Sequence, residues 1–84
     1  MIREIIEAAN RLQAAGLICQ VIQGQDPYIF GGRNEITIGG IRGYDQAFSI
    51  IPVEEGFEIL IQDHSDQHVN TLDIAVQQVI QHLI

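Results

Sequence analysis

The sequence predicts a two-layer α+β fold, in which an antiparallel sheet of four or five strands carries an N-terminal and a C-terminal helix on one face. Amphipathic helical patterns occupy both ends of the chain, at residues 2–15 and 72–83, and short runs of branched apolar residues separated by glycine-containing breaks lie between them. The breaks are too short for parallel crossovers, which need about a dozen or more residues, so consecutive strands should pair antiparallel. Residues 1–84 are expected to form one domain, in the order helix, four strands, a possible fifth strand and helix.

The first helix is predicted from apolar residues that recur every three or four positions. On a helix they form one stripe, made of Ile2, Ile5, Ile6, Ala9 and Leu12. Glu7 stands four residues before Arg11 on the other face, which is the favourable order for a helical ion pair. Gly16 suits the left-handed position after a helix, so we expect the helix to end at about Ala15.

Four segments between the helices have the composition of strands, because they are rich in branched residues and bounded by turn residues. They are residues 17–23, 35–38, 44–51 and 57–63. Residues 28–30 are expected to form a short extended piece, and residues 39–43, with three glycines, are expected to break the chain. Alternation places Phe48 and Ile50 on one face of their strand, and Phe57, Ile59 and Ile61 on the inner face of the next.

The segment after Asp63 fits two interpretations. In the first, residues 64–66 form a turn, residues 67–70 form a short fifth strand and Thr71 caps the last helix. In the second, Ser65 or Asp66 caps a longer helix directly. We favour the first, because it places Asp73 in the first helical turn, where the helix dipole favours an acid.

Charge excludes several kinds of partner. The chain has eleven acidic residues against four arginines, has no lysine, and carries a net charge of −7. Nucleic-acid affinity comes largely from neutralising phosphates, so we expect no nucleic-acid partner, and an anionic membrane is disfavoured for the same reason. No apolar run approaches the roughly 18–20 residues that cross a bilayer.

The location is expected to be cytoplasmic. The first residues lack the basic region and the continuous apolar core of a signal peptide. Cys19 is the single cysteine, so the chain has no internal disulfide.

A metal site is a first candidate, at His64, Asp66 and His68. Imidazole and carboxylate groups are ligands for zinc and other borderline divalent ions, and these three lie within five residues. The alternative is a solvated loop between strand and helix, where Asp, Ser and His are ordinary turn and cap residues.

An anion-binding site is a second candidate, in the glycine-rich segments 31–34 and 39–43. Backbone N–H groups at Gly32 and Gly40, together with the guanidinium groups of Arg33 and Arg42, would hold a phosphate or carboxylate. Neither segment matches a phosphate-binding loop motif. The alternative is that the glycines serve tight turns.

No catalytic arrangement or cofactor motif is found, so we expect no enzyme activity and no cofactor. Cys19 lies in the most apolar strand, where a thiol is a small buried hydrophobe rather than a nucleophile. Glu54, Glu55 and Glu58 cluster near a hairpin end, where carboxylates are ordinarily hydrated.

The sheet face opposite the helices gives the functional hypothesis. Its expected residues are more apolar than water requires: Ala47, Ser49, Ile51 and Leu60. A second copy of the chain or another protein would cover them. We therefore predict a small non-enzymatic interaction or regulatory domain that forms a homo-oligomer or binds a protein partner. A small-ligand or metal-binding protein using one of the two candidate sites is the alternative.

Overall fold

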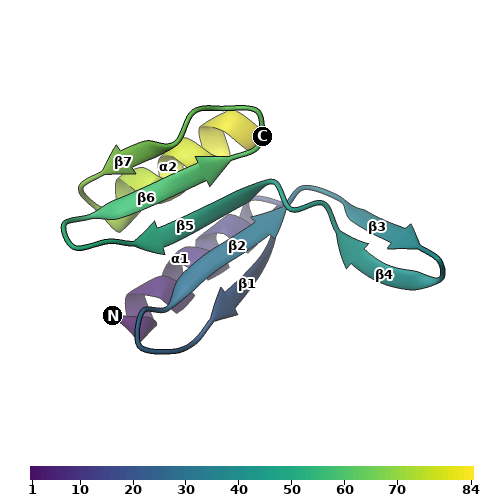
Figure 1. The fold of residues 1–84 in the computed structure, drawn as a ribbon, viewed down its shortest axis with the longest axis horizontal. Coiled ribbons are helices and arrows are strands. Elements are labelled where there is room, and N and C mark those ends of the chain that lie inside the picture. Colours follow the sequence, from purple (N-terminus) through teal and green to yellow (C-terminus); the bar gives the residue numbers. More distant parts are fainter.

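The structure, a computed structural model that describes all 84 residues, has a helix at each end and seven strands between them (Figure 1). The helices are α1 (Ile2–Ala14) and α2 (Leu72–Leu83). The strands are β1 (Ile18–Ile22), β2 (Tyr28–Gly32), β3 (Glu35–Ile38), β4 (Ile41–Tyr44), β5 (Phe48–Pro52), β6 (Phe57–Ile61) and β7 (Gln67–Val69). Five of them form an antiparallel sheet in the order β1-β2-β5-β6-β7, and β3 and β4 form a separate two-stranded hairpin. The predicted α+β fold class is confirmed.

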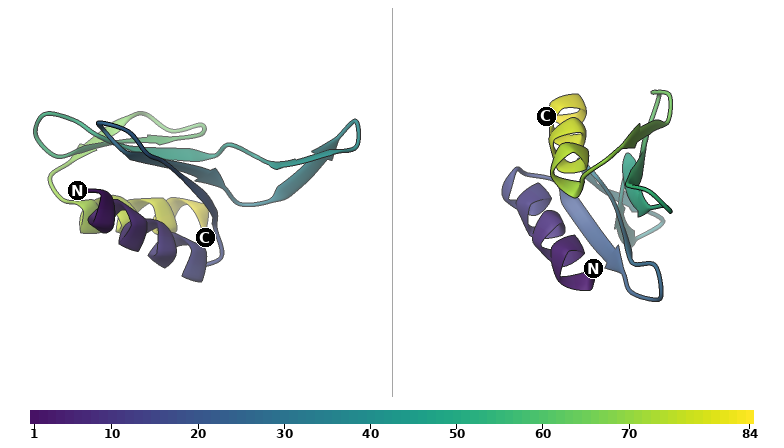
Figure 2. Two further views of the ribbon diagram at one scale, coloured as in Figure 1. Left: turned by 90° about the horizontal axis from the view of Figure 1, so that it is seen from below. Right: turned by 90° about the vertical axis from the view of Figure 1, so that its left-hand side faces the viewer.

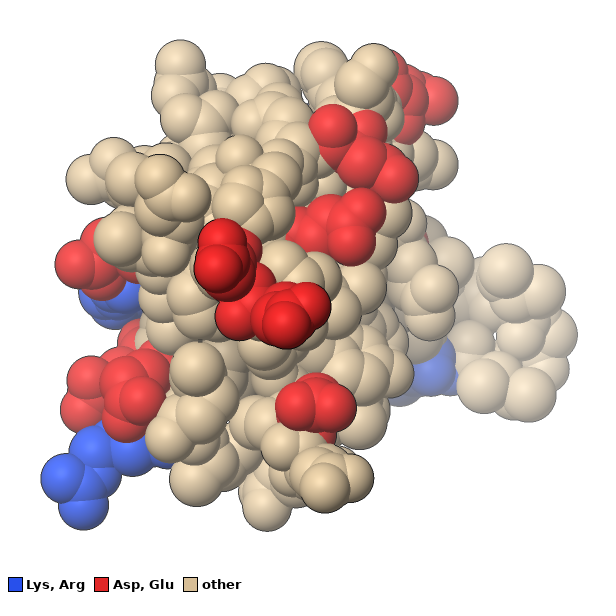
Figure 3. Space-filling view, turned by 60° about the vertical axis from the view of Figure 1, so that its left-hand side comes forward, with Lys and Arg blue, Asp and Glu red and all other residues tan.

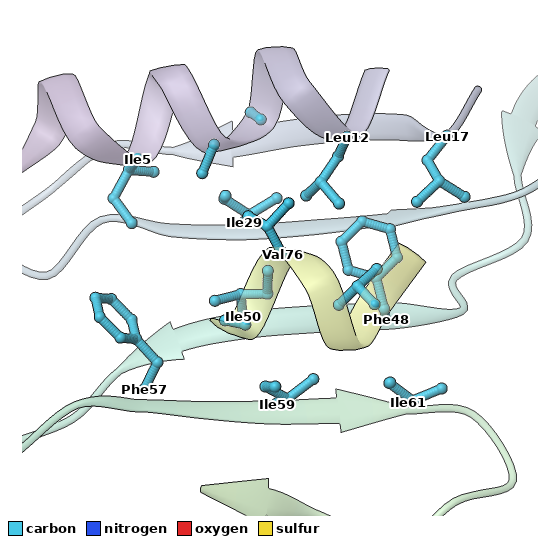
Figure 4. Packing of buried hydrophobic residues seen from close by; sticks show 14 residues of the cluster. Ile5, Leu12, Leu17, Ile29, Phe48, Ile50, Phe57, Ile59, Ile61 and Val76 are labelled. Atoms are coloured by element: carbon cyan, nitrogen blue, oxygen red, sulfur yellow. The ribbon is translucent and has the colours of Figure 1, made fainter. Parts of the chain in front are cut away.

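Both helices lie on one face of the five-stranded sheet, as predicted (Figure 2). Each helix turns an apolar stripe toward the strands, and Ile5, Leu12 and Val79 are fully buried there. The stripe predicted for α1 is partly wrong, since Ile2 and Ile6 are 39% and 41% exposed and Ala8 is buried instead. Figure 4 shows the side chains of the sheet pointing into the same layer. The molecule therefore has one core, which lies between the helices and the inner face of the sheet.

The strand register explains why the inner face is so uniformly apolar. Val21, Ile29, Ile50 and Ile59 are directly paired across four neighbouring strands and form one row. The last three of these side chains are 0% exposed. Because side chains alternate along a strand, the residues between them point to the other face, which we call the outer face.

The element ends follow the local signals in the sequence. Gly16 has φ +105°, so α1 ends where predicted. β7 is the predicted short fifth strand, and the Thr71 hydroxyl oxygen accepts a hydrogen bond from the Ile74 backbone N–H at 3.2 Å. The first of the two interpretations of this segment is confirmed.

Residues 28–30 are extended, as expected, and belong to β2, an interior strand that pairs with both β1 and β5. One strand prediction is wrong. Residues 41–43 do not break the chain but belong to β4, so the single strand expected over residues 44–51 is two strands. The cause is the pair Gly39–Gly40, with φ +58° and +81°, because two residues of positive φ make the tight turn that returns β4 along β3.

The β3–β4 hairpin projects from the end of the sheet along the longest axis of the molecule (Figure 1). The molecule measures 40 × 26 × 21 Å along its principal axes. We call residues 35–44 the arm and the rest of the chain the body. No helix in the chain has the length and apolar character needed to span a membrane.

Candidate functional site

The three predicted metal ligands contact different parts of the chain. The His64 ring meets the His82 ring edge-on, with 4.9 Å between centroids. His68 Nε2 contacts the backbone carbonyl of Glu55, and Asp66 lies at an open groove on the outer face. The structure has no group of three or more His, Cys, Asp or Glu side chains placed to hold a metal ion.

The glycine-rich segment 31–34 does hold a carboxylate, and that carboxylate belongs to the chain itself. Asp45 Oδ1 accepts hydrogen bonds from the backbone N–H groups of Arg33 at 2.8 Å and Asn34 at 2.7 Å. The Asn34 hydrogen bond is the main cause of the lowered pKa of Asp45, because donors to a carboxylate favour its charged form. This internal contact joins the two ends of the arm and occupies two backbone donors of the segment for which the sequence predicted an anion site.

Gly32 fits this junction because it has no side chain. A Cβ added at Gly32 would lie 1.5 Å from the backbone oxygen of Asp45. Only glycine permits this approach of the two chain segments. We call the contact of Asp45 with residues 32–34 the arm clamp.

The other predicted ligand-binding residues have separate roles. Arg42 is paired with Glu35 at 2.9 Å, across the arm. Gly40 lies in the turn at the tip of the arm. Arg33 makes no ion pair, and its backbone N–H belongs to the arm clamp.

Cys19 packs against the core, but it is half-buried rather than fully buried as predicted. Burial raises the pKa of the Cys19 thiol to about 11. The thiolate is therefore scarce near neutral pH, and the group has little nucleophilic character.

The outer face carries apolar and aromatic side chains that no other element covers. Ser49, Ile51 and Leu60 are half-buried there. An open groove of about 580 Å³ crosses this face, and its lining includes Tyr28, Phe30, Ala47, Leu60, Gln62 and Asp66. Ala47, expected among the exposed residues, is only 2% exposed. Its backbone N–H donates to the Gly31 carbonyl oxygen, and its own carbonyl oxygen accepts a hydrogen bond from the Gln62 N–H.

An aromatic row continues from the outer face onto the arm. The Phe30 ring lies 6.2 Å from that of Tyr28 and 6.1 Å from that of Tyr44. The Tyr44 hydroxyl also donates a hydrogen bond to Gln20 Oε1 at 2.7 Å. These contacts hold the base of the arm against the outer face.

The arm itself has one apolar face. Ile36 pairs with Gly43 and Ile38 pairs with Ile41, so the three isoleucines share a face. Their exposed fractions are 40%, 73% and 76% for Ile36, Ile38 and Ile41. We call this surface the isoleucine face. The opposite face of the arm carries Glu35, Thr37, Arg42 and Tyr44.

Sequence reasoning missed the isoleucine face. The alternation of residues 35–38 predicts a strand, but the three glycines at residues 39–43 predict a break after it. The signal that would have revealed the hairpin is the Gly39–Gly40 pair flanked by isoleucine on both sides.

The arm also differs from the body in its net charge. Residues 33–45 carry two arginines and two acids and have no net charge, so the whole net charge of −7 belongs to the remaining nine acids and two arginines. Figure 3 shows acidic side chains spread over the body, while the arm in the background is mostly uncharged.

Comparison with models of known protein families, with characterised proteins and with solved structures gives no match for this chain.

Proposed function

We propose that this chain is a small non-enzymatic interaction or regulatory domain that associates with a second copy of itself. The observation that carries the proposal is the grouping of large apolar side chains where no part of the chain covers them. They lie on the outer face, around Phe30 and Leu60, and on the arm, at Ile38 and Ile41. Grouped apolar surface of this kind marks protein interaction sites, whereas single exposed apolar residues are ordinary.

The size of the domain supports association. A chain of 84 residues buries only about 60–65% of the surface of its unfolded form, so its stability margin is small. A second copy that binds the folded state but not the unfolded state would add to that stability by mass action. The exposed isoleucines are the side chains with most apolar surface left to bury.

Native mass spectrometry of the untreated protein tests the proposal. We expect a dimer mass at micromolar concentration, with the dimer fraction falling on dilution. A strict monomer across that range would contradict self-association. The same spectrum tests the alternative function, since a retained metal ion or anion would favour a ligand-binding protein.

A further inference from the structure

Two histidines that are far apart in the sequence meet at one end of the body. His64 is an exposed residue of the turn that follows β6, and His82 is a half-buried residue in the last turn of α2. Their ring centroids are 4.9 Å apart, and the ring planes make an angle of 76°. The turn after β6 therefore touches the C-terminal end of α2 through two imidazole groups (Figure 1).

The backbone holds both histidines in place. Asp63, just before His64, has φ +67°, a conformation in which aspartate is enriched among the residues other than glycine. The His64 backbone N–H donates to the Ile61 carbonyl oxygen at 3.0 Å, which closes a tight turn at the end of β6. On the other side, His82 is fixed by α2, because its neighbour Leu83 packs against the core. The meeting of the two rings thus follows from the fold of the body.

A hydrogen bond selects the tautomer of His82. Its Nδ1 lies 2.7 Å from the backbone carbonyl oxygen of Gln78. A carbonyl oxygen can only accept, so Nδ1 carries the proton and donates it. In the neutral ring the lone pair is then on Nε2, where it can bind a metal ion. Histidines that bind metals almost always donate their other ring N–H to a carbonyl, a carboxylate or a water in this way.

We propose that His64 and His82 together bind one borderline divalent metal ion, of the class to which zinc and copper belong. Imidazole nitrogen is a ligand that these ions prefer. A zinc–nitrogen bond of about 2.0–2.1 Å places the ion about 3.2 Å from a ring centre, and two such rings at a tetrahedral angle have centres about 5 Å apart. The observed 4.9 Å matches this spacing. The exposed His64 ring needs only to rotate a nitrogen toward the ion.

The ion would join the turn after β6 to the end of α2. No third His, Cys, Asp or Glu side chain joins the pair, so water fills the remaining coordination positions and the ion exchanges readily. Since the two rings meet only in the folded chain, binding adds to the stability of the fold. Of the ligands predicted from the sequence the site keeps only His64, because His68 Nε2 contacts the Glu55 carbonyl oxygen elsewhere. The site lies away from the arm, and it does not depend on the proposed self-association.

Calorimetric titration with Zn²⁺ tests the site, with H64Q, H82Q, the double variant H64Q/H82Q and the matched control H68Q. We expect the wild type and H68Q to bind one ion per chain with equal affinity. Losing a hydrogen-bond partner of a ligating histidine already costs about 10–100-fold in metal affinity, so losing a ligand should cost at least about tenfold. The double variant should be little weaker than either single variant, because one imidazole cannot chelate. Far-UV circular dichroism without metal checks the fold, and H64Q changes only an exposed side chain.

NMR of the histidine rings identifies the ligating atoms. On addition of Zn²⁺ the ring signals of His64 and His82 should follow one binding curve, with His82 bound through Nε2 and those of His68 unchanged. Independent binding curves for the three rings, joint movement of His64 with His68, or no zinc binding at millimolar concentration would each overturn the proposal. Sedimentation equilibrium of the same samples separates this outcome from the proposed function, since a monomer that binds zinc through both rings keeps the site while self-association fails.

Discussion

At the scale of single residues, Asp45 explains how a projecting hairpin is joined to the body. Its carboxylate accepts two backbone hydrogen bonds at the point where the chain enters and leaves the arm. The sequence predicted a site for a phosphate or carboxylate ligand, built from Gly32, Gly40 and two arginine side chains. In the structure the carboxylate against this segment belongs to Asp45, and the donors are the backbone N–H groups of Arg33 and Asn34.

The arm clamp should depend on pH. The pKa of Asp45 is lowered in the folded protein, so the clamp contributes stability above the unfolded pKa of about 3.9 and loses it as pH falls through the lower folded value. We expect the backbone amide signals of Arg33 and Asn34 to shift together over that acidic range in an NMR titration. In D45N these shifts should be absent. Equal titration in D45N and wild type would contradict the role of the carboxylate.

Gly32 should be intolerant of any side chain. In G32A the new methyl group meets the backbone of Asp45, which cannot rotate away as a side chain would. We expect a loss of about 1–3 kcal/mol, the usual cost of overpacking. G24A is the matched control, because nothing lies within 4 Å of a Cβ at Gly24 and its φ is not positive. Chemical denaturation should show a clear loss for G32A alone, and equal midpoints would contradict the close approach.

At the scale of elements, alternation along β5 separates the core from the outer face. Ile50 is 0% exposed and packs under the helices, whereas Ile51 points to the outer face and is half-buried. We expect I50A to lower the free energy of unfolding by about 2–5 kcal/mol and I51A by clearly less, because only the first leaves a cavity in a closed core. Denaturant titration of the two variants measures this difference. Similar losses would mean that the outer face is packed as well.

The elements that the sequence predicted best are those fixed by local signals. The end of α1 follows from Gly16, and the start of α2 follows from Thr71. The hairpin was harder, because Gly43 lies inside a strand, where glycine is usually a sign of a break. It is accommodated opposite Ile36, on a ribbon with open space around it. The tight turn at Gly39–Gly40 makes residues 35–44 a hairpin, because it pairs β4 with β3.

At the scale of the whole molecule, the placement of both helices on one face of the sheet follows from their apolar stripes and from the strongly apolar inner face of the sheet. This arrangement and the bare outer face were predictable from alternation. The arm was not, because its direction depends on the bend held by Asp45, a contact between residues eleven positions apart that only the folded chain brings together. The exposed apolar surface proposed for self-association therefore includes the arm, which the sequence did not indicate.

The division of charge predicts how the proposed self-association should depend on salt. Since the net charge of −7 lies on the body and the arm is neutral, added salt should screen body–body repulsion without weakening the apolar contact. We expect the dissociation constant to fall modestly as ionic strength rises, measured by sedimentation equilibrium at several salt concentrations. An interface held by ion pairs would weaken instead.

The central claim is that a second copy of the chain covers its exposed apolar side chains, those of the arm among them, and amide hydrogen exchange measured at two protein concentrations tests it most directly. At a concentration where the dimer dominates, the amides of β3 and β4 should be strongly protected. On dilution they should exchange faster while those of β2, β5 and β6 stay unchanged. Exchange in the arm that is equally fast at both concentrations, in a protein whose mass shows a dimer, would contradict the account.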